Sequence, residues 1–120
     1  MTRQENTGIR DLTFSGWVRE NLPNSATGFM VTDIDFYMYN YKTKKHLLVE
    51  VKNNNAPLKK WQSIMYKNLS HWIDSAAKKD GWDFKGFYFI KFVKTSFKDG
   101  VYLNDKISSE EEIIKKLSLE

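Results

Sequence analysis

The stretch of residues 86–93, GFYFIKFV, constrains the fold more than any other segment, because it is almost entirely apolar. A strand at a protein surface alternates apolar and polar residues, whereas a strand covered on both faces is apolar throughout. We therefore expect this segment to be a central strand of a sheet. Other elements must cover both faces of that sheet, and helices are the usual cover.

Hydrophobic periodicity predicts the remaining elements. Apolar residues recur at helical spacing before Pro23 and again through a longer later stretch, and the two segments between these stretches alternate as half-buried strands do. Asp99-Gly100 is typical of a tight turn between two short strands, and Ser109 with Glu112 has the spacing of a helix capping box. The predicted elements are helix 11–22, strands 30–41 and 46–52, helix 58–79, strand 86–93, short strands 94–97 and 101–103, and a last helix.

This order predicts an α/β (α+β) fold in which a mixed sheet is flanked by helices. A chain of 120 residues fits one domain, residues 1–120. Aromatic residues make up 15% of the chain, and each buries a large area, so the core can be built from few side chains. We expect Trp61, Trp72 and Trp82 to be part of it.

Composition narrows the functional classes. The chain has no cysteine, which excludes disulfides and thiolate metal sites and favours an intracellular, cytoplasmic setting. No apolar run approaches the length that a bilayer requires, so we expect no membrane partner. The net charge of +4 permits binding to a polyanion such as nucleic acid without requiring it.

Charged residues lie at the end of strand 46–52, where the pattern is otherwise apolar. Leu47, Val49 and Val51 share one face, which we expect to face the core. Glu50 and Lys52 share the opposite face, so a carboxylate and an ammonium group lie side by side. The preceding strand contributes further carboxylates, although aspartate is rare in strands.

Those carboxylates belong to Asp33 and Asp35, which alternation places on one face. Hydrolysis of a phosphodiester requires a hard cation, and Mg²⁺ or Mn²⁺ prefers oxygen ligands. Asp35 and Glu50 are therefore the candidate metal ligands, with the carbonyl of Val51 as a third ligand. Asp33 is an alternative or additional ligand. Lys52 would orient the attacking water or stabilise charge on phosphorus.

These residues resemble the PD-(D/E)xK nuclease superfamily. Ile34-Asp35 stands for the Pro-Asp half of its motif, with Ile34 at the proline position, and Glu50-Val51-Lys52 stands for the ExK half. The resemblance implies a restriction-endonuclease-like core and a metal-dependent nuclease, with DNA as the expected substrate and endonucleolytic cleavage. Small phage or mobile-element proteins of this superfamily are the most similar in general appearance.

The resemblance continues into helix 58–79 and covers residues 12–93. Gln62 and Tyr66 match the Q-x-x-x-Y pattern of RecB-like members, which implies that both reach the site from one helix face and that Gln62 takes part in catalysis. Glu20 is the candidate for the acidic residue that the superfamily often adds from its first helix. It could equally be a solvated surface residue.

Three further residues are candidates for contact with nucleic acid: Lys59, Lys60 and Tyr66. The row formed by Tyr37, Tyr39 and Tyr41 could be a stacking platform for unpaired bases. Half-buried sheet surface is the interpretation we favour for that row, because such rows are more often part of a sheet's packing.

Other classes of function remain open. Glu50 and Lys52 could form an exposed cross-strand salt bridge, which contributes little to stability. The chain could be a catalytically silent nucleic-acid-binding or phage regulatory module on the same fold, or an interaction protein. A homodimer or a protein partner could supply specificity that so small a chain lacks.

Overall fold

The computed structural model describes residues 13–120, which form two compact units, one ending at Asp33 and one beginning at Ile34. The first unit contains helix α1 (Thr13–Asn21) and a 3-10 turn (Ser25–Thr27). The side chain of Asn24 begins this turn by accepting a hydrogen bond from the N–H of Ala26 at 3.0 Å. The prediction of a single domain stays a prediction.

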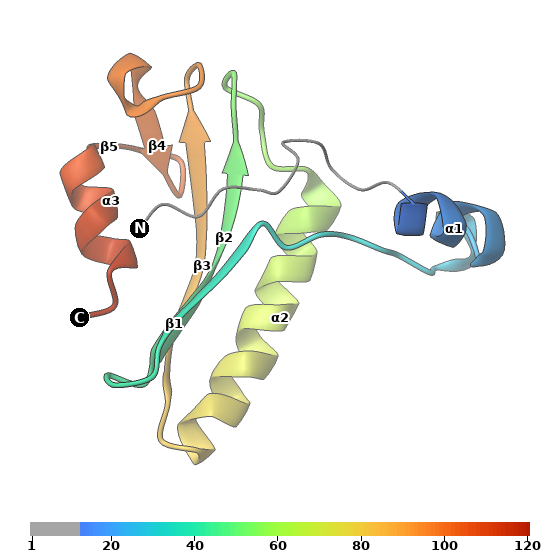
Figure 1. The fold of residues 1–120 in the computed structure, drawn as a ribbon, viewed down its shortest axis with the longest axis horizontal. Helices are drawn as coiled ribbons and strands as arrows, with labels where there is room; N and C mark the ends of the chain where they lie inside the picture. The colour runs from blue at the N-terminus through green and yellow to red at the C-terminus, as the bar shows by residue number, and fades with distance from the viewer. Residues whose placement is uncertain (1–12) are drawn as a thin grey trace. The chain divides into compact units, whose positions relative to one another are not determined.

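The second unit is built on one mixed five-stranded sheet, in the order β1-β2-β3-β4-β5 (Figure 1). Its strands are β1 (Phe36–Asn40), β2 (Lys45–Lys52), β3 (Asp83–Phe92), β4 (Val101–Leu103) and β5 (Lys106–Ser108). Helix α2 (Lys60–Lys79) connects β2 to β3, which are parallel, and the other neighbouring strands are antiparallel. Helix α3 (Glu110–Leu117) follows β5. The predicted mixed α+β class is confirmed.

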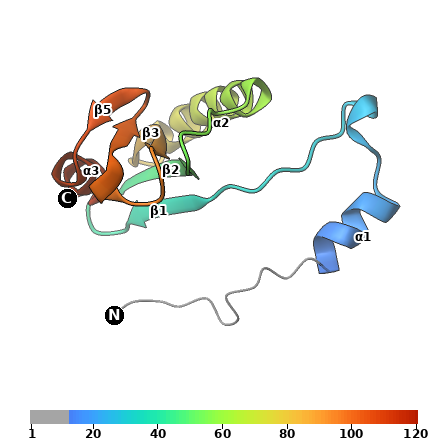
Figure 2. The ribbon, with the colours of Figure 1, turned by 90° about the horizontal axis from the view of Figure 1, so that it is seen from above.

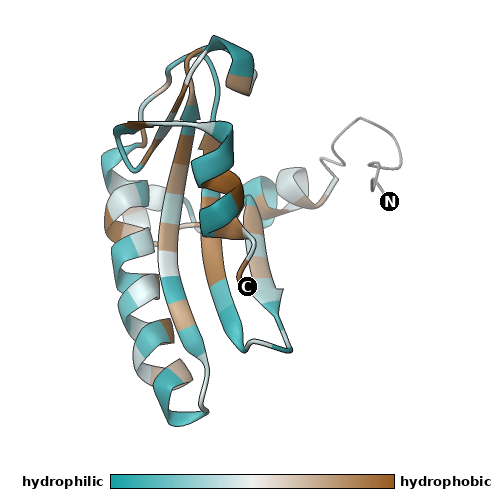
Figure 3. Cartoon of the chain, turned by 90° about the vertical axis from the view of Figure 1, so that its left-hand side faces the viewer, coloured by the Kyte–Doolittle hydropathy of each residue, from teal (hydrophilic) through white to brown (hydrophobic). Residues whose placement is uncertain are grey.

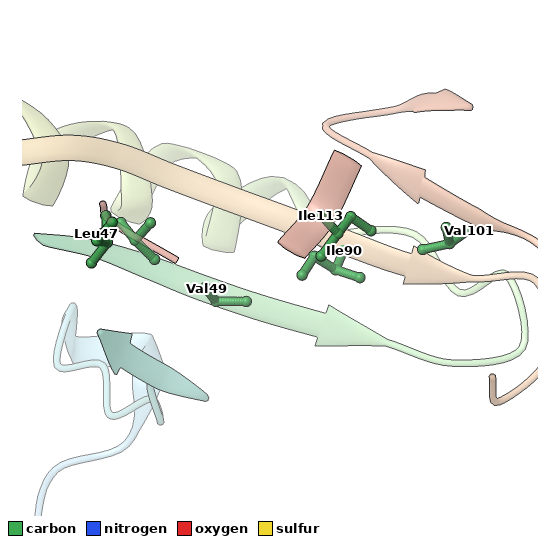
Figure 4. Close-up of a cluster of buried hydrophobic side chains, with 6 residues drawn as sticks. Leu47, Val49, Ile90, Val101 and Ile113 are labelled. Carbon is green, nitrogen blue, oxygen red and sulfur yellow. The ribbon is translucent and has the colours of Figure 1, made fainter. Parts of the chain in front are cut away.

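The two helices of this unit cover opposite faces of the sheet (Figure 2). On one face Leu47 and Val49 of β2 pack with Ile90 of β3, Val101 of β4 and Ile113 of α3 (Figure 4). On the other face the core contains Leu48, Tyr66, Ala77 and Phe84, which come from β2, α2 and β3. The expectation that β3 is a central strand covered on both faces is therefore confirmed.

Hydropathy follows this layering. Brown, hydrophobic residues are concentrated on the central strands, and the visible side of α2 is mainly teal and white (Figure 3). None of the helices in residues 13–120 is long and apolar enough to span a membrane.

The predicted hairpin is present, but its first strand is shorter than expected. Strand β1 begins at Phe36, whereas the alternating pattern predicted a start at residue 30. The register pairs Phe36 with Val49, and beyond this point the ladder stops. The N–H of Val51, which would otherwise extend the ladder, donates to the carboxylate of Asp35 at 2.8 Å. A side chain thus ends the strand, and residues 30–35 have no strand pairing.

The predicted turn at Asp99-Gly100 between two strands is wrong. Residues 94–97 form no strand, and residues 97–99 form a 3-10 turn. The hairpin joins β4 to β5 through Asn104 and Asp105, which both have positive φ, at 50° and 67°. Two consecutive residues with positive φ are typical of a type I′ turn, whose twist matches that of the two strands it joins. Asn and Asp tolerate positive φ better than most residues.

Two tryptophans of helix α2 do not lie where the sequence predicted. Trp72 is 62% exposed and Trp61 is 37% exposed, so the expectation that both lie in the core is wrong, whereas Trp82 packs against the core. The buried residues of α2 are Gln62, Tyr66 and Ala77. Met65, Leu69 and Ile73 pack against the core on this side of the helix, and the Tyr66 hydroxyl donates to Glu50 of β2 there.

Truncation of a core residue of β2 provides a test of this packing. Leu47 is fully buried, so we expect Leu47→Ala to lower the free energy of unfolding by about 2–5 kcal/mol. Chemical denaturation measures the change. Ile107→Ala is the matched control, because Ile107 is 81% exposed and its truncation should change stability by no more than about 0.5 kcal/mol. Equal effects of the two substitutions would contradict the assignment of the core.

Candidate functional site

A carboxylate is buried beneath the N-terminal half of α2. Glu50, near the end of β2, is only 5% exposed. The hydroxyl of Tyr66 donates a hydrogen bond to Glu50 Oε2 at 2.7 Å. Tyr66 is itself fully buried, and its ring stacks on that of Phe87 of β3 at 3.9 Å between centroids. A buried acid that has a dedicated donor is held in one orientation.

Asp35 brings a second carboxyl group to Glu50. It precedes β1 directly and is exposed, and the Val51 N–H fixes its Oδ2. Asp35 lies close enough to Glu50 for its charge to raise the pKa of the Glu50 carboxyl group. The sequence-based expectation that these two acids converge from adjacent segments of a hairpin is therefore met. Val51 takes part through its N–H, and a role for its carbonyl group as a ligand stays a prediction.

An ammonium group completes the cluster. Lys52 Nζ lies 3.8 Å from Glu50 Oε1, and the Lys52 side chain is 23% exposed. The alternative of an ordinary exposed salt bridge does not describe this pair, because the carboxylate partner is buried. We refer to Asp35, Glu50 and Lys52 as the acidic site.

The surroundings oppose ionisation of Glu50. Burial raises the pKa of Glu50, and the charge of Asp35 raises the pKa further, while the Tyr66 hydroxyl and Lys52 act in the opposite direction. The net direction is upward. Burial and the neighbouring Glu50 also raise the pKa of Tyr66, so its hydroxyl stays protonated and remains a donor.

The remaining residues expected from α2 are placed differently. The side-chain oxygen of the buried Gln62 accepts a hydrogen bond from the N–H of Lys59 at 3.2 Å, so it caps the start of the helix. Its catalytic role stays a prediction. Tyr66 was expected to contact nucleic acid, but a fully buried side chain has no surface for such contact. Lys59 and Lys60 are exposed at the start of α2.

Two predicted acidic residues, Glu20 and Asp33, lie in the first unit, and their roles stay predictions. Within residues 13–120, no group of three or more histidine, aspartate or glutamate side chains converges as a metal site would require. A cation at the acidic site would therefore have Asp35 and Glu50 as its carboxylate ligands. Phe87, which supports Tyr66, was missed because an apolar run does not reveal which ring lies beneath a helix.

Comparison with known proteins places the chain in a family. It is 30% identical over 113 residues to a protein of Archaeoglobus fulgidus described as uncharacterized, and the match covers 88% of this chain and 74% of the relative. The chain belongs to the same family as this archaeal protein. It matches no family model and no solved structure.

The raised pKa of Glu50 predicts a pH-dependent effect of its amide substitution. A folded-state pKa above the unfolded value means that stability is greatest at low pH and falls as pH rises through the folded pKa. Glu50→Gln stays neutral and avoids this loss. We expect the variant to melt at a higher temperature than the unsubstituted chain at pH 8 in EDTA, and at nearly the same temperature at pH 4.

Thermal melts at the two pH values, with the exposed Glu111→Gln as matched control, measure this difference. The control should show little change at either pH. If Glu50→Gln melts below the unsubstituted chain at pH 8, or raises the melting temperature more at pH 4 than at pH 8, ionised Glu50 is not disfavoured.

Tyr66→Phe tests the hydrogen bond to Glu50. The phenyl ring retains the stacking on Phe87 but leaves a buried carboxylate oxygen without its donor. We expect a loss of about 1.5–3 kcal/mol in the free energy of unfolding at pH 8, the range for hydrogen bonds to charged groups. In a Glu50→Gln background the loss should be smaller, and denaturation of all four chains gives the coupling energy.

Tyr41→Phe is the control for removal of a hydroxyl, because Tyr41 is 71% exposed. Its stability should be unchanged. Additive effects of Tyr66→Phe and Glu50→Gln would argue against a direct interaction between the two side chains.

Proposed function

We propose that this chain is a divalent-cation-dependent nuclease that hydrolyses phosphodiester bonds in nucleic acid, with DNA as the expected substrate. The observation that carries the proposal is the acidic site. Two carboxyl groups from adjacent segments of a hairpin lie near enough for one to act on the pKa of the other, and an ammonium group lies 3.8 Å from Glu50. This is the arrangement that the PD-(D/E)xK resemblance implies for Asp35, Glu50 and Lys52.

The donor set suits a hard cation. Two adjacent carboxylates repel each other when both are ionised, and burial makes ionisation of Glu50 still less favourable. A divalent cation that binds both would remove this repulsion. Mg²⁺ commonly takes one or two protein carboxylates and keeps water and substrate phosphate as its other ligands. Asp35 and Glu50 supply that number, and Mn²⁺ fits the same oxygen ligands.

Each residue then has a stated role in hydrolysis. A bound cation would neutralise charge on the phosphate and lower the pKa of a coordinated water. Asp35 and Glu50 would hold the cation, and Tyr66 keeps Glu50 oriented through its hydrogen bond. Lys52 donates to the attacking water or to a phosphate oxygen, where negative charge increases in the transition state. Water adds to phosphorus, one P–O bond breaks, and the products are a phosphate monoester and an alcohol.

The finer fold assignment is part of the same proposal. The succession of α1, the β1–β2 hairpin, α2 and β3 is the order expected of a restriction-endonuclease-like core. That order supports the nuclease assignment. We also propose an intracellular location. Self-association would allow two sites to cut both strands of a duplex.

Cleavage assays test the proposal. The purified chain is incubated with supercoiled plasmid and with a labelled oligonucleotide in Mg²⁺, Mn²⁺ or EDTA. We expect cleavage only with a divalent cation, and losses of about 100-fold or more in Asp35→Asn, Glu50→Gln and Lys52→Ala. Asp74→Asn is the matched control, because Asp74 pairs with Lys78 on α2 and should retain activity.

A metal-binding measurement separates the roles of these residues. Mn²⁺ at 100 times its dissociation constant should stabilise the unsubstituted chain by about 2.7 kcal/mol, seen as a higher melting temperature. Lys52→Ala should keep this stabilisation and lose cleavage, whereas Glu50→Gln should lose both. Cleavage that persists in Glu50→Gln and Lys52→Ala, or an unsubstituted chain that neither binds Mn²⁺ nor cleaves, would refute the nuclease assignment.

A further inference from the structure

Strand β1 exposes two aromatic rings at the edge of the sheet. Tyr37 is 52% exposed and Tyr39 is 60% exposed, so this part of the row is half-buried sheet surface, as expected, and about half of each residue is open to solvent. Their rings are 5.6 Å apart between centroids and inclined at 27°, which makes a nearly continuous aromatic surface. Exposed rings that are grouped on one surface point to a binding role, whereas scattered ones do not.

The inner ring of this pair is held in place. Tyr37 OH forms a 2.8 Å hydrogen bond with Nδ1 of His46, which is only 7% exposed. His46 in turn makes edge-to-face contacts with the rings of Trp82 and Phe84, at 5.6 and 4.9 Å between centroids. The exposed Tyr37 ring therefore rests on a packed aromatic support and is fixed before any ligand arrives. A fixed ring loses little conformational entropy on binding.

The rings lie on the same face as the acidic site. The register pairs Tyr37 with Leu48 and Tyr39 with His46, and Leu48 belongs to the core on the α2 face. Glu50 is on that face as well, since Tyr66 of α2 donates to it. Asp35, just before β1, accepts from the N–H of Val51, the residue after Glu50, so the two rings follow the acidic site directly along the chain.

Positive charge flanks this row. Lys42 and Lys44 are exposed in the turn that follows β1, and Lys59 and Lys60 are exposed at the start of α2. Lys42 and Lys44 follow Tyr39 along the chain, and Lys59 and Lys60 begin the helix whose Tyr66 binds Glu50, so a polyanion on this surface would find lysines on both elements. Its bases would also contact the rings. A surface of charged groups alone binds the phosphates and provides no such contact with the bases.

We propose that Tyr37 and Tyr39 form a stacking platform for the unpaired bases of a single-stranded nucleic acid, with the strand directed toward the acidic site. This inference rests on the proposed function and narrows its substrate to unpaired segments. The 5.6 Å between the rings is less than the roughly 7 Å that an inserted base would need, so bases stack on the exposed ring faces. In a duplex these base faces are already covered by neighbouring bases.

Fluorescence anisotropy of a labelled oligodeoxynucleotide in EDTA tests the platform without cleavage. We expect Tyr39→Ala to weaken binding of the single strand about tenfold, since stacking on an aromatic side chain contributes substantially per base. Tyr39→Phe keeps the ring and should keep the affinity. An oligonucleotide of the same length in which abasic sugars replace the stacking bases should bind Tyr39→Ala and the unsubstituted chain equally.

Ile107→Ala, on the other edge strand, is the control and should bind as the unsubstituted chain does. The platform is overturned if Tyr39→Ala binds the single strand normally, if the abasic oligonucleotide shows the same loss, or if no oligonucleotide binds. A blunt duplex that loses affinity equally in Tyr39→Ala also overturns it.

The two proposals fail in different ways. Ring-dependent binding of single strands in EDTA, without cleavage in Mg²⁺ or Mn²⁺, would retain the platform and refute the nuclease. If Tyr39→Ala cleaves both single strands and duplexes as fast as the unsubstituted chain does, the nuclease is retained and the platform is refuted.

Discussion

The buried carboxylate of Glu50 is the constraint on which the arrangement of α2 depends. An ionisable group placed between a helix and a sheet is costly unless a partner satisfies it. Tyr66 is that partner, and its hydroxyl reaches Glu50 only when its side of α2 faces the sheet. The ring of Tyr66 then lies flat on Phe87 of β3. The same side chain therefore packs the core and orients Glu50. The packing of α2 on the sheet and the orientation of Glu50 cannot vary independently.

The sequence was sufficient for the features that depend on local pattern. The apolar run around Phe89 predicted the central strand, and alternation predicted the two faces of β2. A short hairpin also has a restricted register, which is why the proximity of Asp35 and Glu50 could be expected before the structure was known. These predictions succeeded because strand alternation and hairpin geometry leave few alternatives.

Features that depend on distant partners could not be predicted in the same way. Helix α2 has apolar residues on more than one side, and Trp61 and Trp72 lie outside the side that packs on the core. Tyr66 on the packed side has its partner, Glu50, on another element. The β4–β5 turn was missed for a related reason, because Asp99-Gly100 is the stronger local turn signal although Asn104 and Asp105 make the hairpin. Tertiary contacts overrode local preference at each point.

The end of β1 links the edge of the sheet to access to the site. Had the ladder continued past Phe36, the backbone before β1 would have bonded to Val51 and kept Asp35 within a strand. Instead the Asp35 carboxylate takes the Val51 N–H and stays exposed, while its neighbour Glu50 is buried. In the proposed function, a cation or phosphate would approach Glu50 by way of Asp35 and the partly exposed Lys52. The residue that terminates the strand thus also provides a solvent-facing approach to the buried acid, at the same edge where Tyr37 is exposed.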